Sequence, residues 1–193
     1  MHVWLADLSA WQDPDISCLD EEERSRSARL RFDADRGRYE RSHAFLRHVL
    51  AQYTGTDPGV LVFKSAEHGK PFLLRGPRFN LSHAGERAAV AVAAREEVGV
   101  DIESTVRRVD PEEILTRFFH PADLAAWRAT PRAERVDRFF EAWTRQEAVL
   151  KALGTGIAGG LGRSPVLNPP AGAPWRLYPI EAGPGYKATL AVL

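Results

Sequence analysis

Two long amphipathic stretches, one in each half of the 193-residue chain, constrain the fold most strongly. Residues 33–55 and 132–154 carry apolar and aromatic side chains at helical spacing, and each stretch ends at a glycine. An Arg-Phe pair and an acidic residue precede each helical run, and segments typical of strands follow it. The repeated order predicts two related α+β halves, although any two amphipathic helices look somewhat alike.

Short segments around these stretches complete the expected fold. Apolar, β-prone runs predict strands at residues 2–8, 60–67, 70–74, 78–85, 88–94, 97–104, 175–182 and 185–193, and capping patterns predict further helices at 18–32, 107–119 and 121–127. We therefore predict an α+β fold in which each half is a small antiparallel sheet packed with a long helix. The expected halves are residues 1–104 and 105–193.

The composition argues against several classes of protein. The 26 basic and 26 acidic residues balance, which disfavours a nucleic-acid partner recruited by overall charge. Cys18 is the only cysteine, so an internal disulfide and a multi-cysteine metal site are impossible. No apolar run approaches the ~20 residues of a membrane helix, and residues 1–10 lack the basic region of a signal peptide. We expect a cytoplasmic enzyme or binding protein.

The sequence "VGVDIE" at residues 98–103 ends in two carboxylates. Side chains alternate along a strand, so Asp101 and Glu103 point to one face and Ile102 to the other. Carboxylate oxygens at this spacing suit a hard divalent cation such as Mg²⁺. The alternative is a strand that simply ends in solvent.

The second long stretch carries "WTRQEAVLKA", in which Glu147 and Lys151 are four residues apart and share one helix face. The plain interpretation is an ion pair worth about 0.2–0.5 kcal/mol. The functional interpretation makes Glu147 a third metal ligand or a general base, and Lys151 a counter-charge for phosphate. The apolar neighbours of the pair indicate a buried helix, which favours a position beside a cleft.

Polar residues before the first carboxylate pair are candidates for holding an anion. Ser82 and His83 are adjacent, so their side chains diverge and make a poor nucleophile and base, and a G-x-S-x-G elbow is absent. With Asn80 they are instead good donors to an anionic ligand. Lys70 stands between a glycine and a proline in an expected turn, which suits phosphate. A buried histidine and a solvated lysine are the alternatives.

These elements, in this order, resemble the 4′-phosphopantetheinyl transferases of the surfactin-synthetase-activating (Sfp-type) class. The matching motifs are "GKPF" (69–72), "FNLSHAG" (79–85), "VGVDIE" (98–103) and "WTRQEAVLKALGTGI" (143–157). The resemblance implies a pseudo-dimer of two α+β halves. It also implies transfer of the phosphopantetheine arm of coenzyme A to a serine of an apo acyl or peptidyl carrier protein, with Mg²⁺ required and adenosine 3′,5′-bisphosphate released.

The resemblance assigns roles to individual residues. It places Mg²⁺ on Asp101, Glu103 and Glu147, and makes Glu147 the base for the incoming serine, directly or through water. Lys151 stabilises the pyrophosphate and the leaving group. The expected coenzyme A contacts are Arg26, Lys70, Asn80, Ser82, His83, Asp101 and Lys151, with Arg26 and His83 near the 3′-phosphate. Residues 105–125 are the implied carrier surface, and the enzyme is expected to be a monomer.

One position departs from the family pattern, and two other functions stay open. The family often carries lysine immediately before the helix glutamate, where this chain has Gln146, so Arg145 is a possible substitute. The alternatives are another Mg²⁺-dependent enzyme, such as a nuclease, and a carrier-protein or nucleotide-binding module without activity. The sequence does not name the carrier, which could belong to peptide, polyketide or fatty-acid synthesis.

Overall fold

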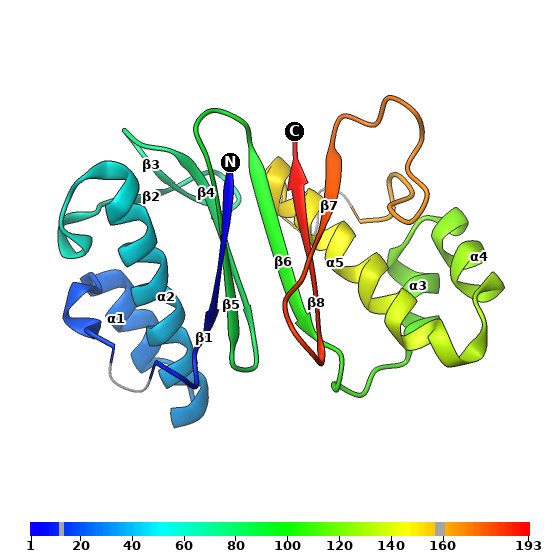
Figure 1. Cartoon of the computed structure of the whole chain (residues 1–193), viewed down its shortest axis with the longest axis horizontal. Helices are drawn as coiled ribbons and strands as arrows, with labels where there is room; N and C mark the ends of the chain where they lie inside the picture. The colour runs from blue at the N-terminus through cyan, green and yellow to red at the C-terminus, as the bar shows by residue number, and fades with distance from the viewer. Residues whose placement is uncertain (12–13, 157–160) are drawn as a thin grey trace.

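Two three-stranded antiparallel sheets lie side by side, each with helices on its outer side (Figure 1). The computed structural model describes residues 1–11, 14–156 and 161–193, so the end of the fourth motif, Ile157, lies outside the described residues. The strands are β1 (His2–Asp7), β2 (Phe63–Ser65), β3 (Pro71–Leu73), β4 (Arg78–Ala84), β5 (Arg87–Ala93), β6 (Val98–Ser104), β7 (Arg176–Ile180) and β8 (Tyr186–Val192). The α-helices are α1 (Glu21–Ala28), α2 (Asp33–Thr54), α3 (Pro111–Phe118), α4 (Pro121–Ala129) and α5 (Arg135–Leu153), with short 3₁₀ turns at Ile16–Cys18, Pro58–Val60 and Arg132–Glu134.

The two halves share one connectivity, which confirms the predicted fold class. In the first sheet β5 lies between β1 and β4, and in the second β8 lies between β6 and β7. Each half thus runs from a strand through a long helix to a hairpin whose last strand takes the central place. The small hairpin of β2 and β3 is an addition of the first half.

Capping residues and glycines mark several helix ends, although α1 ends at Ala28 and not near residue 32 as predicted. Asp20 and Glu23 form a reciprocal capping box at the start of α1, and Asp110 accepts two amide hydrogen bonds at the start of α3. Both long helices close on a left-handed glycine, Gly55 for α2 and Gly154 for α5. In the described part of the chain, no helix has the length and apolar character needed to cross a membrane.

The strand β6 belongs to the second sheet, where it pairs with β8 from Val98 to Ser104. The expected boundary after residue 104 placed it in the first half. Sheet pairing therefore divides the halves one strand earlier, before Val98. The reason is that strand pairing joins residues far apart in sequence. β6 precedes α3, but it pairs with β8, which begins at Tyr186.

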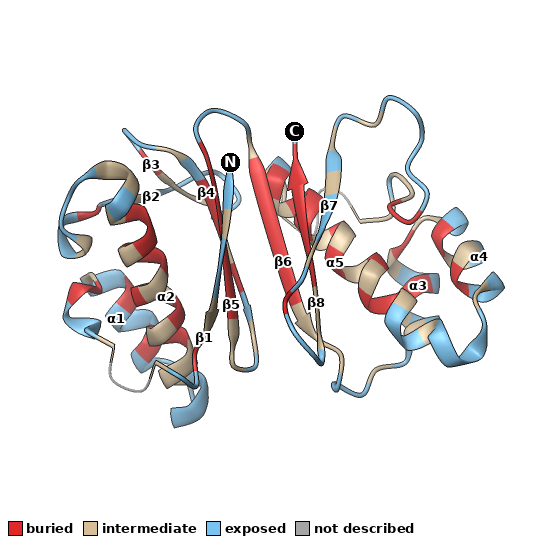
Figure 2. Cartoon of the chain, in the orientation of Figure 1, coloured by how far each residue is buried: buried red, intermediate tan, exposed pale blue. Residues whose placement is uncertain are grey.

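The sequence of β5 explains how the halves pack. Its alanines Ala89, Ala91 and Ala93 belong to a core cluster with β6 and β8, whereas Val90 and Val92 pack with residues of α2. Alternation along the strand sends the small residues to one face and the larger ones to the other. The small face allows the second half to lie close, and Figure 2 shows the buried strands at this contact.

The inner strands β4 and β6 lie against each other without a backbone ladder between them. Side chains make the link: Asn80 Oδ1 accepts the amide of Val100 at 2.8 Å, and Ser82 Oγ accepts the amide of Ile102 at 3.3 Å. On the other side of β6, a Cβ at residue 99 would overlap the backbone of α5, so Gly99 is required for this close approach. Asn80 and Ser82 therefore link the two halves, and Gly99 allows α5 to pack closely on β6.

Candidate active site

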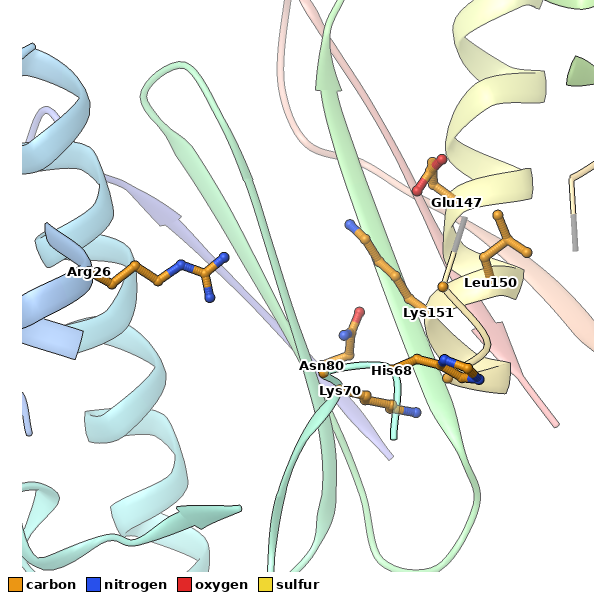
Figure 3. A pocket seen from close by; sticks show the side chains of 10 residues that line it. Arg26, His68, Lys70, Asn80, Glu147, Leu150 and Lys151 are labelled. Atoms are coloured by element: carbon orange, nitrogen blue, oxygen red, sulfur yellow. The ribbon is translucent and has the colours of Figure 1, made fainter. Parts of the chain in front are cut away.

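A cavity of about 490 Å³ lies between the halves, beside the last turns of α5 (Figure 3). Arg26 on α1 points into it from the first half, and Glu147 and Lys151 point into it from the second. The lining residues are Arg26, His68, Gly69, Lys70, Asn80, Glu147, Leu150, Lys151, Gly154 and Gly156. The fold thus gathers three cationic side chains, Arg26, Lys70 and Lys151, and one carboxylate from segments far apart in sequence, which is an arrangement suited to a polyphosphate ligand.

Lys151, Asp101 and Ser82 form a closed triangle at the wall of this site. The ammonium of Lys151 donates to Asp101 Oδ1 at 2.6 Å and to Ser82 Oγ at 2.9 Å. The hydroxyl of Ser82 donates to the same Asp101 oxygen at 3.0 Å. Ser82 and Asp101 are both buried. The serine therefore orients a carboxylate and an ammonium, and it does not face His83.

The ion pair between Glu147 and Lys151, which was the plain alternative to a functional role, does not form among the described residues, and Lys151 pairs with a more distant residue. The described residues contain no salt bridge between these two side chains, and Lys151 reaches across to Asp101 on β6 instead. The reason is the close packing of α5 on β6 at Gly99, which brings the lysine within reach of a buried carboxylate. Glu147 keeps its carboxylate toward the cavity.

The three predicted metal ligands share one electrostatic environment. Burial raises the pKa of Asp101, and burial together with the charge of Asp101 raises the pKa of both Glu103 and Glu147. Asp101 Oδ2 is buried and has no hydrogen-bond partner among the described residues. Hard oxygen donors with raised pKa values and one unsatisfied buried oxygen fit a divalent cation.

The carboxylates do not yet converge on one point. Within residues 1–11, 14–156 and 161–193, no group of three histidine, cysteine or acidic side chains is close enough to hold a metal ion as it stands. Lys151 holds one oxygen of Asp101. Trp143 donates its indole N–H to Glu103 Oε1 at 3.1 Å, and Arg107 lies 4.0 Å from the other oxygen. Among the described residues, the three carboxylates therefore do not form a metal site as they stand.

His83 faces a second cavity, of about 600 Å³, on the first half. Arg26 and Asn80 line both cavities, so the two adjoin. His83 is exposed at this cavity, and desolvation by the cavity walls together with the charges of His43, Lys151 and Arg38 lowers its pKa. The alternation of β4 thus sends Ser82 to the carboxylates and His83 to a separate basic cavity.

The second cavity contains several residues beyond those predicted from the sequence. Arg38, Tyr39 and His43 of α2 line it. The ring of His43 stacks on Tyr39 with centroids 4.0 Å apart, and its Nδ1 lies 2.8 Å from the buried carboxylate of Glu23. A histidine within an amphipathic helix carried no distinctive signal, because its partner Glu23 lies on another helix.

Gln146 and Arg145 do not serve the cleft. The amide of Gln146 donates to Phe118 O at 3.2 Å and accepts the amide of Gly162 at 3.4 Å, so it links α5 to the end of α3. Arg145 donates to the carbonyls of Val166 and Leu167. Neither residue lines the cavity between the halves. Arg145 therefore does not lie at the cavity, where a substitute for the family's lysine was expected.

The structure defines an α+β protein of two related halves with a cleft between them, and comparison with known proteins gives the family. Residues 97–189 match the model described as the 4′-phosphopantetheinyl transferase superfamily. Residues 2–96 match the model for the N-terminal part of 4′-phosphopantetheinyl transferases. The two models meet just before β6, in agreement with the sheet pairing.

Curated relatives carry the same name. The chain is 35% identical over 167 residues to 4′-phosphopantetheinyl transferase HetI of Nostoc sp., which covers 82% of the chain and 70% of that protein. It is 32% identical over 147 residues to a putative 4′-phosphopantetheinyl transferase of Synechocystis sp., covering 74% and 60%. A 4′-phosphopantetheinyl transferase of Bacillus subtilis is 28% identical over 149 residues, covering 76% and 65%. The chain belongs to the 4′-phosphopantetheinyl transferase family.

Proposed function

We propose that this protein transfers the 4′-phosphopantetheine group of coenzyme A to a serine of an apo carrier protein. The observation that carries the proposal is the cleft itself, where Arg26 of one half faces Glu147 and Lys151 of the other. The adjoining cavity with His83 and Arg38 supplies a second basic region for a ligand with separated phosphates. Family membership and the names of the relatives support the same reaction.

The residues of the cleft have complementary tasks in this reaction. The phosphorus–oxygen bond to the leaving adenosine 3′,5′-bisphosphate breaks as the serine oxygen of the carrier attacks the phosphorus. Glu147 is the proposed proton acceptor for that serine, directly or through water, because its carboxylate points into the cavity. Lys151 brings positive charge to oxygens that become more negative, and Ser82 and Asp101 hold its ammonium in place.

We also propose Mg²⁺ as the metal, with Asp101, Glu103 and Glu147 as its protein ligands. The ion would neutralise pyrophosphate charge when bound. Because Mg²⁺ binds few carboxylates together with substrate phosphates, its affinity should rise sharply in the presence of coenzyme A. Calorimetric titration of Mg²⁺ with and without coenzyme A measures this. Equal affinity in the two titrations would contradict the shared site.

The finer assignment is to the Sfp-type class, acting as a monomer in the cytoplasm on an acyl or peptidyl carrier. The similarity to the Bacillus subtilis transferase supports the class, and a free, buried Cys18 agrees with a reducing compartment. A panel of apo carriers from peptide, polyketide and fatty-acid synthesis would rank the partners. Sedimentation of the chain alone would test the monomer.

One experiment separates this function from its rivals. The purified chain is incubated with coenzyme A, Mg²⁺ and an apo carrier, and the carrier is weighed by mass spectrometry. The transferase adds one phosphopantetheine to the carrier serine. A non-catalytic module binds coenzyme A or carrier and leaves the carrier mass unchanged. A nuclease cleaves nucleic acid under the same conditions without modifying the carrier.

A further inference from the structure

Lys70 lines the cleft, but its ammonium is already occupied by protein groups. The Nζ atom donates to the carbonyl of Ala152 at 2.9 Å, to the carbonyl of Val98 at 3.2 Å and to Glu97 Oε2 at 2.9 Å. An ammonium has three donors, and all three are used. The side chain is 14% exposed. A phosphate-binding lysine needs a free donor, whereas all three donors of Lys70 bind protein groups.

The two carbonyls belong to different elements of the second half. Ala152 is in the last turn of α5, where carbonyls have no partner within the helix. Val98 is the first residue of β6. The next residue, Gly99, is the point where the backbones of α5 and β6 touch. Lys70 therefore links α5 to β6 at the end of their closest contact. Its positive charge also interacts favourably with the negative end of the helix dipole.

The hairpin that carries Lys70 is itself fixed. The amide of Ala66 donates to the carbonyl of Lys70 at 2.9 Å, and the amide of Gly69 donates to the carbonyl of Ala66 at 2.8 Å. Gly69 has a φ of +82°, which favours glycine, and Pro71 follows the lysine. A tight turn of the first half thus presents one ammonium to the second half in a set direction.

We propose that Lys70 is a positioning residue, which sets the register of α5 on β6 and thereby the placement of Lys151 and Glu147. Lys151 meets Asp101 across the same helix–strand contact, at 2.6 Å. A shift of α5 along β6 would separate that pair and would move Glu147, one turn earlier, with it. The expected effect on kcat rests on the proposed transfer reaction. The expected effect on the packing of α5 rests on geometry alone.

The test compares Lys70→Met with Lys64→Met, a change of an exposed lysine on the same hairpin. A loosened helix should lower kcat by about 10-fold to 100-fold, as small misplacements of reacting groups do. The dissociation constant of coenzyme A, measured by calorimetry, should stay within about twofold, because the ammonium donates its hydrogen bonds to the protein and not to the ligand. Hydrogen exchange should accelerate in residues 150–154. Lys64→Met should change none of the three.

The opposite pattern would overturn the proposal. If Lys70 binds phosphate, Lys70→Met weakens coenzyme A binding strongly, and exchange in the last turn of α5 is unchanged. Exchange and calorimetry need no turnover, so a parent chain that transfers nothing would contradict the proposed function while leaving the clamp testable.

A second variant serves if Lys70→Met does not fold. Glu97→Gln removes the carboxylate partner, which is 41% exposed, and leaves both carbonyl bonds intact. A clamp predicts unchanged coenzyme A affinity and unchanged exchange in residues 150–154. A phosphate ligand predicts tighter coenzyme A binding, because the ammonium is released from its counter-charge, and that result would refute the clamp.

Discussion

Each half contains a cluster of acidic side chains around a buried carboxylate, Glu23 in the first half and Asp101 in the second, and the two carboxylates differ in their hydrogen-bond partners. In the first half, Glu23 accepts Arg47 Nε at 2.7 Å and the amide of Asp20 at 3.0 Å, with His43 at its other oxygen. Arg47 is fully buried and also reaches Asp20 and two backbone carbonyls. In the second half, Asp101 has Lys151 and Ser82 on one oxygen and no described partner on the other.

The pKa values follow from this difference. Burial raises the pKa of Glu23, but hydrogen bonds from His43 and Asp20 and the charge of Arg47 outweigh it, and the net pKa is lowered. Burial dominates at Asp101, and it is joined at Glu103 and Glu147 by repulsion from Asp101, so these three pKa values are raised. A carboxylate cluster that is saturated with donors supports the fold, and one left short of donors is available to a ligand.

The largest expected effect is on turnover, from Glu147→Gln. If Glu147 accepts the serine proton, its loss should lower kcat by about 10²-fold to 10⁴-fold, while the circular dichroism spectrum stays the same. The matched control is Asp137→Asn on the same helix, which breaks only a solvent-exposed pair with Lys187. Turnover within a few-fold of the parent would contradict both proposed roles of Glu147, as the base and as a metal ligand.

The next effect is on stability, from Arg47→Met. Removing the cation leaves Glu23 buried without its main counter-charge, and breaking such a pair costs about 3–5 kcal/mol of unfolding free energy. The control is Arg128→Met, since the pair of Arg128 with Glu112 is more than half exposed and should contribute only about 0–1 kcal/mol. Urea denaturation measures both. Similar small losses of unfolding free energy in the two variants would contradict the view that the ion pairs of Glu23 stabilise the fold.

A smaller effect is expected from Lys151→Arg. The ammonium fits between Asp101 and Ser82 as a compact point charge, whereas a guanidinium is a wide planar fork. We expect turnover to fall by roughly 10-fold or more through misplacement, and Lys151→Ala to lose at least as much. Lys187→Arg, whose partner Asp137 is exposed, should behave as the parent. Near-normal turnover in Lys151→Arg would mean that charge alone is required.

The smallest effect is a pH dependence of opposite sign in the two clusters, measured by urea denaturation in metal-free buffer. A raised folded pKa means that the contribution of Glu147 to stability is present below its unfolded pKa and is lost as pH rises. Glu147→Gln should therefore be more stable than the parent at neutral pH, and the gain should vanish in acid. Glu23, with a lowered pKa, contributes stability that is lost as pH falls, so Glu23→Gln should be less stable at neutral pH. Stability changes of the same sign in Glu147→Gln and Glu23→Gln at neutral pH would contradict the proposed difference between the two clusters.

Local sequence determined the elements and most of the residues of the site. Capping residues predicted the starts of α1 and α3, glycines predicted the C-terminal ends of α2 and α5, and the alternating alanine and valine residues predicted a strand at β5. The motifs predicted the family, which the comparisons confirm. They also predicted that Arg26, Lys70, Asn80, Glu147 and Lys151 gather at one place, as they do around the cleft.

The tertiary structure alone decided which partners these residues choose. Lys151 has Glu147 four residues away, yet it pairs with Asp101, 50 residues away in sequence. Lys70 binds the carbonyl of Ala152, 82 residues away, and Ser82 and Asn80 bind the backbone of β6. Helix spacing and strand alternation describe only near neighbours. These contacts depend on how closely α5 packs on β6, and that distance is set by the missing side chain of Gly99 and by the alanine face of β5.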